Sequence, residues 1–179
     1  RSVELGLRGA LAPLGLRFEL AGYRSRLDNA LVQFEGANEQ AFFRNAGESS
    51  RQGLEALLEL RPAPGLRARL AYTWRDYTFV RFAIADGDFA GNAEPGVPPH
   101  QLSASAQYDA PSGLHASARA RHLAAYAVNN ANTLANWAYT VVDLRFGIAR
   151  EWAGMQMRPF IGIDNVFGER YNSSTISNS

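Results

Sequence analysis

The chain alternates between apolar and polar residues over long stretches. The clearest example runs from Leu66 to Trp74, where every second residue is apolar or aromatic and two of the residues between them are Arg. Segments 101–108 and 114–121 repeat the pattern, with Leu, Ala and Tyr set against Ser, Gln, His and Arg. Because successive side chains of a strand point to opposite faces, this pattern predicts strands with one apolar and one polar face.

Weaker alternation predicts more strands of the same kind. It occurs in segments 3–7, 16–20, 54–60, 142–148 and 155–163. A helix would not gather these residues on one side, since residues i and i+2 of a helix lie on opposite sides. We therefore expect about eight strands, each near or above the roughly 9–11 residues that cross a bilayer.

The connections between these strands alternate in length. Segments 13–15, 62–65, 110–113 and 151–154 contain Pro or Gly and predict tight turns, whereas segments 32–40, 81–99 and 128–136 are longer and polar. Short turns on one side and long loops on the other are typical of outer-membrane barrels. We therefore predict an all-β, antiparallel, up-and-down transmembrane β-barrel segment of about eight strands from a larger barrel.

The same rhythm predicts where the ends lie. The first strand runs into a short turn and the last one leaves a short turn, so both ends belong on the long-loop side. Bacterial barrels usually have both ends in the periplasm. We therefore expect residues 1–179 to be an interior part of the barrel, with at least one further strand after Ser179.

Composition narrows the function classes. The formal net charge is +1, all 18 basic residues are Arg, and Cys is absent. This balance argues against a nucleic-acid partner, and no apolar run approaches the roughly 20 residues of a membrane helix. Aromatic residues near the predicted strand ends, namely Tyr72, Trp74, Tyr77, Phe79, Tyr108 and Trp152, predict two interfacial girdles.

Four segments resemble the C-terminal barrel of TonB-dependent receptors. They are Asn45-Ala46-Gly47 with Gly53-Leu54-Glu55, Pro95-Gly96-Val97-Pro98 with His100-Gln101-Leu102, Asn132-Thr133 with 139–144, and 163–171, which reads IDNVFGERY. The resemblance covers most of the chain after Tyr23. It implies a barrel of about 22 strands, of which residues 1–179 are one part, without the N-terminal plug domain, its TonB box and the last strand.

The resemblance also implies a function. Such a receptor lies in the outer membrane of a Gram-negative bacterium, in contact with lipid, and imports a scarce ligand, most often a ferric siderophore. The TonB complex would supply the energy through the plug domain. No resident cofactor is expected.

Candidate ligand contacts lie in the long outer loops. Arg and aromatic side chains suit an anionic, ring-rich iron chelate, through charge and stacking. The candidates are Arg81, Phe82, Phe89, Asn92, Asn130, Asn132 and Trp137. Ordinary solvated loops with interface anchors are the alternative interpretation of the same residues.

The polar faces predict one ion pair. Across the turn at 62–65, face parity places Glu59 opposite Arg67 or Arg69. Half-buried charges need partners, so we expect a ladder of Glu and Arg inside the barrel.

Two other classes stay open at this point. A small complete outer-membrane barrel could be a lipid-modifying enzyme, but the sequence contains no G-x-S-x-G motif, and His115 and His122 fall on opposite faces. The spacing of His100, His115 and His122 does not predict a metal site. A soluble β-barrel binding module would also alternate, but with shorter strands.

Overall fold

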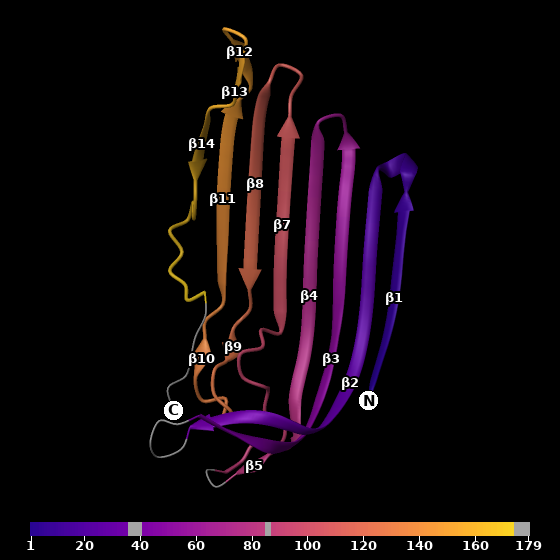
Figure 1. Cartoon of the computed structure of the whole chain (residues 1–179), viewed down its shortest axis with the longest axis vertical. Coiled ribbons are helices and arrows are strands. Elements are labelled where there is room, and N and C mark those ends of the chain that lie inside the picture. The colour runs from indigo at the N-terminus through magenta and orange to yellow at the C-terminus, as the bar shows by residue number, and fades with distance from the viewer. Residues whose placement is uncertain (36–40, 85–86, 174–179) are drawn as a thin grey trace.

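Eight antiparallel strands form one open sheet. The computed structural model describes the backbone of residues 1–35, 41–84 and 87–173, and the side chains of these residues outside 29–46. In sheet order the strands are β1 (Ser2–Leu11), β2 (Leu16–Glu35), β3 (Ala41–Ala63), β4 (Leu66–Arg81), β7 (His100–Asp109), β8 (Leu114–Leu123), β11 (Tyr139–Ile148) and β14 (Phe160–Ile163) (Figure 1). The predicted all-β, antiparallel, eight-stranded segment is confirmed.

Short elements occupy the connections. The 3-10 turn η1 (Ala12–Leu14) joins β1 to β2, and three two-stranded ribbons pair β5 (Ala83–Ile84) with β6 (Gly87–Asp88), β9 (Tyr126–Ala127) with β10 (Ala135–Asn136), and β12 (Arg150–Trp152) with β13 (Met155–Met157). The first two ribbons lie in the long links. Within the described residues, no helix is long and apolar enough to cross a membrane.

All short turns lie at one end of the sheet and the long links at the other (Figure 1). The β12–β13 turn shows why it is tight: Ala153 and Gly154 have φ of 49° and 76°, the paired positive values of a type I′ turn. In Figure 1 each short turn lies higher than the one before it, from the β1–β2 turn to the β12–β13 turn. Such a stagger is expected where strands tilt around a barrel axis.

The two faces of the sheet differ in chemistry. A row of directly paired residues on one face, the apolar face, consists of Leu58, Leu70, Ala104, Ala120 and Val142. The neighbouring row on the other face, the polar face, consists of Arg17, Glu59, Arg69, Ser105, Arg119 and Asp143. Within the described residues, no layer covers the apolar face, since Leu5 and Ile161 are 80% and 73% exposed. Such a face requires an apolar environment outside the sheet.

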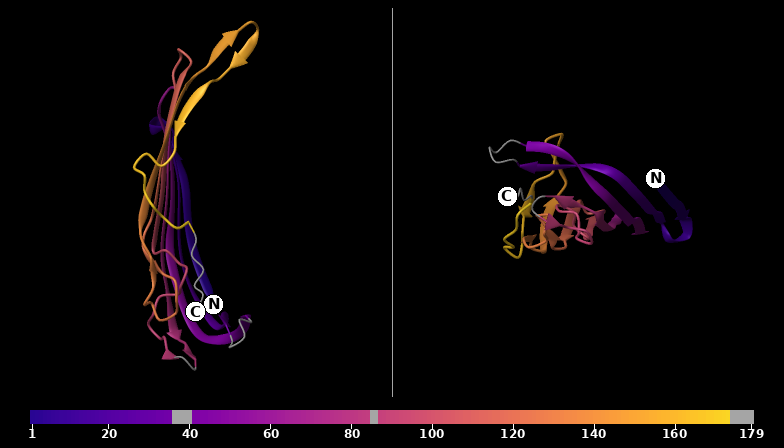
Figure 2. Two further views of the ribbon diagram at one scale, coloured as in Figure 1. Left: turned by 90° about the vertical axis from the view of Figure 1, so that its left-hand side faces the viewer. Right: turned by 90° about the horizontal axis from the view of Figure 1, so that it is seen from below.

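The two ends of the described chain, at Arg1 and near Asn172, lie at the long-link end, as predicted. The Arg26 amide donates to the Arg1 carbonyl at 2.8 Å, and Asn136 Nδ2 donates to the Asn172 carbonyl at 3.3 Å. In Figure 2 the outer part of the β2–β3 hairpin and the β12–β13 ribbon lean to the same side of the sheet.

The loop predicted at 32–40 has the wrong bounds, because residues 32–35 belong to β2. Strand β2 continues to Glu35 and β3 begins at Ala41, with Glu35 paired to Ala41; residues 36–40 lie outside the described residues. The hairpin therefore extends past the apolar face, because backbone pairing continues in water whatever the polarity of its side chains.

The last predicted strand, 155–163, is interrupted. Arg158 and Pro159 separate β13 from β14, which is only 4 residues long. Proline has no amide hydrogen to donate, so the ladder breaks there. The register is nevertheless continuous: Arg150 pairs with Met157 and Gly147 with Phe160.

The aromatic girdle is confirmed only in part. Tyr72 and Trp74 share the apolar face with Leu70, whereas Tyr77 and Phe79 are an odd number of residues further and turn to the polar face. Phe79 is 5% exposed and belongs to a core at the long-link end. Strand parity, and not only proximity to a loop, decides where an aromatic side chain points.

Candidate functional site

The long-link end holds a small hydrophobic core. Phe79 and Phe82 are 5% and 3% exposed, and Ile84 and Phe89 pack against them. The ring centroids of Phe79 and Phe82 lie 4.6 Å apart, and those of Phe82 and Phe89 lie 5.6 Å apart. This core folds the link between β4 and β7 onto the outer end of β4.

Hydrogen bonds join this link to the one between β8 and β11. Asn132 Oδ1 accepts from the Ala93 amide at 2.8 Å, and its Nδ2 donates to the Ala93 carbonyl at 3.0 Å. Asn92 Nδ2 donates to the Asn130 carbonyl at 2.8 Å. Asn132 has a φ of 55°, a conformation that Asn tolerates better than most residues. We call these contacts the loop staple.

The seven predicted ligand contacts therefore have different surroundings. Phe82 and Phe89 are in the small core, and Asn92 and Asn132 are in the loop staple. Asn130 Oδ1 is buried without a hydrogen-bond partner within the described part of the chain. Arg81 and Trp137 project outward, with 78% of the Arg81 side chain and 82% of Trp137 exposed.

A second group of side chains lies together on the polar face just inside the long links. We call it the mouth cluster: Tyr23, Ser49, Arg51, Tyr77 and Glu94. Arg51 Nε and Nη2 lie 2.9 and 2.8 Å from the two carboxylate oxygens of Glu94, and Ser49 Oγ also donates to that carboxylate. The Tyr23 and Tyr77 hydroxyls hydrogen-bond at 2.8 Å, and Arg51 Cζ lies 5.3 Å from the Tyr77 ring centroid.

Strand register assembles the mouth cluster. Arg51 pairs directly with Tyr77, and Tyr23 pairs with Gly53. A Cβ on Gly53 would lie 2.6 Å from Tyr23 Cζ, so only glycine lets that ring cross β3 towards Tyr77. The sequence interpretation missed this cluster because its members come from four separate segments. The one signal available in the sequence was that strand alternation puts Arg51 on the same polar face as Tyr23 and Tyr77.

Glu48 forms another ionic contact at this end. It accepts hydrogen bonds from Arg26 and, at 3.1 Å, from Arg81 Nε. These contacts, first the one from Arg26, lower the pKa of the Glu48 carboxyl. Along β3 towards the long-link end, Leu54 is the last apolar residue on its face and Gln52 is the next residue on that face. Glu48 lies four residues further in the same direction and is therefore outside the apolar part of the strand.

A comparison with family models identifies the fold. Residues 1–166 match the family described as TonB dependent receptor-like, beta-barrel. The chain belongs to this family. TonB-dependent receptors are outer-membrane proteins of Gram-negative bacteria, so the predicted location is confirmed, and the family decides against the enzyme and soluble-module alternatives.

Solved receptor structures share the fold of this TonB-dependent receptor barrel. The ferric yersiniabactin uptake receptor FyuA of Yersinia pestis matches 99% of the chain with a TM-score of 0.76 and 21% identity, over 26% of its own length. The ferric preacinetobactin receptor BauA of Acinetobacter baumannii matches 95% with a TM-score of 0.75 and 19% identity, over 25% of its length. The copper transporter OprC matches 96% with a TM-score of 0.69 and 15% identity, over 25% of its length. The chain thus spans about a quarter of these proteins.

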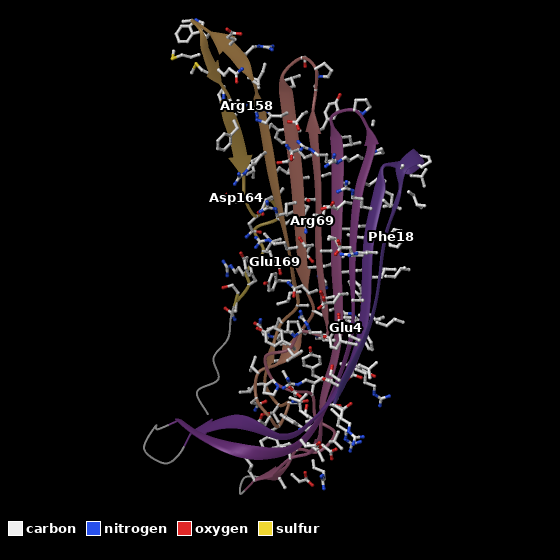
Figure 3. All side chains as sticks on the ribbon, turned by 45° about the vertical axis from the view of Figure 1, so that its right-hand side comes forward. Glu4, Phe18, Arg69, Arg158, Asp164 and Glu169 are labelled. Atoms are coloured by element: carbon white, nitrogen blue, oxygen red, sulfur yellow. The ribbon has the colours of Figure 1, made fainter. Side chains whose placement is uncertain are left out.

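In a receptor barrel the apolar face contacts lipid and the polar face lines the lumen. The lumen side carries the predicted ion pair, in which Arg69 Nε lies 3.8 Å from Glu59 Oε1. Figure 3 labels Arg69 among the side chains of the sheet. Arg67 instead pairs with Asp109 at 2.6 Å, and Arg121 with Asp143 at 3.7 Å. The predicted pairing of Glu59 is confirmed, with Arg69 as its partner. The partners of Arg67 and Arg121 are Asp residues and not the Glu residues of the predicted ladder.

The histidines of the receptor barrel have structural partners. His100 Nδ1 hydrogen-bonds the Tyr72 hydroxyl at 2.8 Å, and His122 Nδ1 the Thr140 hydroxyl at 2.9 Å. His115 covers Gly147 on the lumen side, opposite to His122 in parity. Within the described residues, no group of three or more His, Asp or Glu side chains is arranged to hold a metal ion.

Proposed function

We propose that residues 1–179 form one part of the barrel wall of an outer-membrane receptor that imports a scarce ligand by TonB-coupled active transport. A ferric siderophore is the first candidate ligand. The observation that carries the proposal is family membership over residues 1–166. Two of the structures similar in fold are named as receptors for ferric preacinetobactin and ferric yersiniabactin, and a third, PiuA of Acinetobacter baumannii, is named as a siderophore receptor.

The chemistry of the long-link end supports an anionic, ring-rich ligand. The mouth cluster brings Arg51 and two tyrosine rings to the lumen side of the outer opening. A guanidinium group suits carboxylate or phenolate oxygens, and aromatic faces suit flat chelating rings. Arg81, the last residue of β4, and Trp137 are the residues that we propose as first contacts, because both are exposed.

The energy source in this proposal is the TonB complex. As the family resemblance implies, the complex would act through the plug domain and not through residues 1–179. Membrane lipid is the other partner, on the apolar face.

Uptake by the native bacterium tests the proposal. We expect deletion of the gene to abolish uptake of radioactive iron supplied as one siderophore complex, and restoration of the full-length gene to recover it. A strain lacking TonB should show the same loss. Normal iron uptake in the deletion strain, together with reduced copper uptake, would replace iron by copper as the cargo; normal uptake of both metals would refute transport of either.

A further inference from the structure

The Glu94 carboxylate contacts Arg51 in the way that a bound carboxylate ligand would. Both carboxylate oxygens of Glu94 face the guanidinium of Arg51, at 2.9 and 2.8 Å. This two-point geometry is the one by which arginine recognises carboxylates in general. The Glu94 side chain is 8% exposed and the Arg51 side chain 33%, so the arginine remains accessible from the lumen while its internal partner is buried.

The backbone of Glu94 is held independently of its carboxylate. The Glu94 amide donates to the Tyr77 carbonyl at 2.9 Å, and the Gly91 amide donates to the Phe79 carbonyl at 2.8 Å. Thr78 also forms a bridge with Ala93. The segment 91–94 therefore continues the sheet beside the outer end of β4, and the Glu94 side chain can move without separating that segment from the barrel.

The surroundings of Arg51 suit a ring-bearing anion. Its guanidinium lies 5.3 Å from the Tyr77 ring centroid, and the Tyr77 hydroxyl is hydrogen-bonded to Tyr23. Ser49 Oγ donates to Glu94 and is 1% exposed, so the hydroxyl is already placed to donate to an oxygen anion. A neutral ligand would gain less from this combination of donors than an anion, and a cationic ligand would be repelled by the guanidinium.

We propose that Arg51 is an anion-binding residue of this receptor and that Glu94 is its built-in competitor, which an anionic chelate displaces. The proposal rests on the proposed function only in assuming that a chelate reaches the mouth cluster. Two anions at one guanidinium repel each other, so the ligand and the Glu94 carboxylate exclude one another. The carboxylate thereby selects for ligands that carry several negative charges and can outcompete a single one.

The test is chelate binding by the full-length receptor in detergent, measured by equilibrium dialysis with radioactive iron. The probe is the tris-catecholate complex of Fe(III), a ring-rich trianion, and the ferric complex of desferrioxamine B, a cation, is the control. Glu94→Gln keeps the size of the side chain but removes the competing charge. We expect it to bind the trianion about tenfold more tightly, the scale of one charge-assisted hydrogen bond.

Two further variants separate charge from packing. Arg51→Gln should weaken binding of the trianion by about tenfold or more, and Ser49→Ala, which removes a neutral donor to the same site, should weaken it by less than Arg51→Gln does. None of the three should alter binding of the cationic chelate. Amide hydrogen exchange at Gly91 and Glu94 should stay at the wild-type rate in Glu94→Gln, which checks that the segment remains folded.

The outcomes are distinct from those of the uptake experiment. Unchanged or weaker binding of the trianion by Glu94→Gln would make Glu94 a structural anchor and overturn the competition. Full binding by Arg51→Gln, or no binding by either the wild type or Glu94→Gln, would overturn the anion site. Each of these results leaves the proposal of transport unaffected if the deletion strain still loses iron uptake. Normal uptake in that strain refutes the proposed function and leaves the anion site unaffected.

Discussion

The spanning part of the sheet and its long-link end are built on opposite principles. In the spanning part, large apolar side chains such as Val3, Leu5 and Ile161 are 75%, 80% and 73% exposed, and no second layer of the described part of the chain covers them. At the long-link end, Phe82 and Ser49 are 3% and 1% exposed, and side chains contact one another across several segments. The spanning part therefore depends on its surroundings, the lipid and the rest of the barrel, whereas the long-link end carries packing of its own.

This difference assigns the roles of the two regions. A single-layered wall places its charged residues in the lumen in fixed rows, because the strand register sets them. A self-packed outer end holds polar groups such as Arg51 and Glu94 in defined positions, which recognition of a ligand requires. The following variants separate the two principles, and they are ordered by expected effect.

The largest effect is expected in the small core. Phe82→Ala should lower the free energy of local opening of the long-link end by about 3 kcal/mol or more, because it removes a fully buried ring. The Phe89 amide, which donates to the Phe82 carbonyl at 2.8 Å, reports this opening through hydrogen exchange. Trp137→Ala is the control, since Trp137 is 82% exposed and should have little effect. Equal exchange in both variants would show that the core does not hold the link.

In the spanning part, the destabilisation caused by an added charge should depend on whether the charge lies on the apolar or the polar face of the sheet. Leu70→Arg places a cation on the lipid-facing side and should destabilise the folded receptor by about 2–4 kcal/mol. Ala71→Arg, the next residue on β4, faces the lumen and should cost less than about 1 kcal/mol. Denaturant titration of the full-length receptor in lipid vesicles compares the two. A larger loss for Ala71→Arg would reverse the assignment of the faces.

The loop staple should show an intermediate effect. Asn132→Ala loses four side-chain hydrogen bonds, two to Ala93 and one each to Asn129 and Asn130, in a residue with positive φ. We expect about 1–2 kcal/mol of local stability to be lost. Asn132→Gly loses the same bonds but accepts the backbone conformation, so it should lose less. Exchange of the Ala93 amide measures both variants, and equal losses would assign the whole effect to the hydrogen bonds.

Acid should weaken the outer ends of β2, β3 and β4 through Glu48. Its pKa is lowered in the folded protein, so the stabilisation is present above the pKa of the unfolded chain and disappears as the pH falls through the folded-state pKa. Protection of the amides in the Glu48–Arg81 pairing, measured as the exchange rate relative to the intrinsic rate at the same pH, should therefore fall at acid pH in the wild type. In Glu48→Gln this protection should already be lower at neutral pH and should lose its pH dependence; an unaltered acid response would assign the effect to another carboxyl group.

The smallest effect is expected from the ion pair in the lumen. Glu59 and Arg69 lie 3.8 Å apart, with side chains 44% and 60% exposed. A solvated pair of this kind contributes about 0–1 kcal/mol. Glu59→Gln should therefore unfold at nearly the wild-type denaturant concentration, and a loss well above that range would mean that the pair is shielded in the complete barrel.

The same division explains how far the sequence predicts the structure. The faces of Leu66–Trp74 and the placing of Glu59 opposite Arg67 or Arg69 follow from alternation and one tight turn, because both are local. The choice of Arg69 depends on the register, which shifts between Leu60 and Ala63. The extension of β2 to Glu35 and the break at Pro159 depend on where backbone pairing continues, which side-chain alternation does not report. The small core and the mouth cluster unite segments distant in the sequence, so residues such as Phe82 and Asn132 could be selected for chemistry but not placed.

The loop staple affects how the two links can evolve and how they can be engineered. Since Asn132 is bonded to Ala93 and Asn92 to the Asn130 carbonyl, each link carries part of the other's architecture. A graft that exchanges one link for that of another receptor leaves unmatched partners on its neighbour. The two links form one transplantable unit, and substitutions that diversify either of them are expected to arise in compensating pairs.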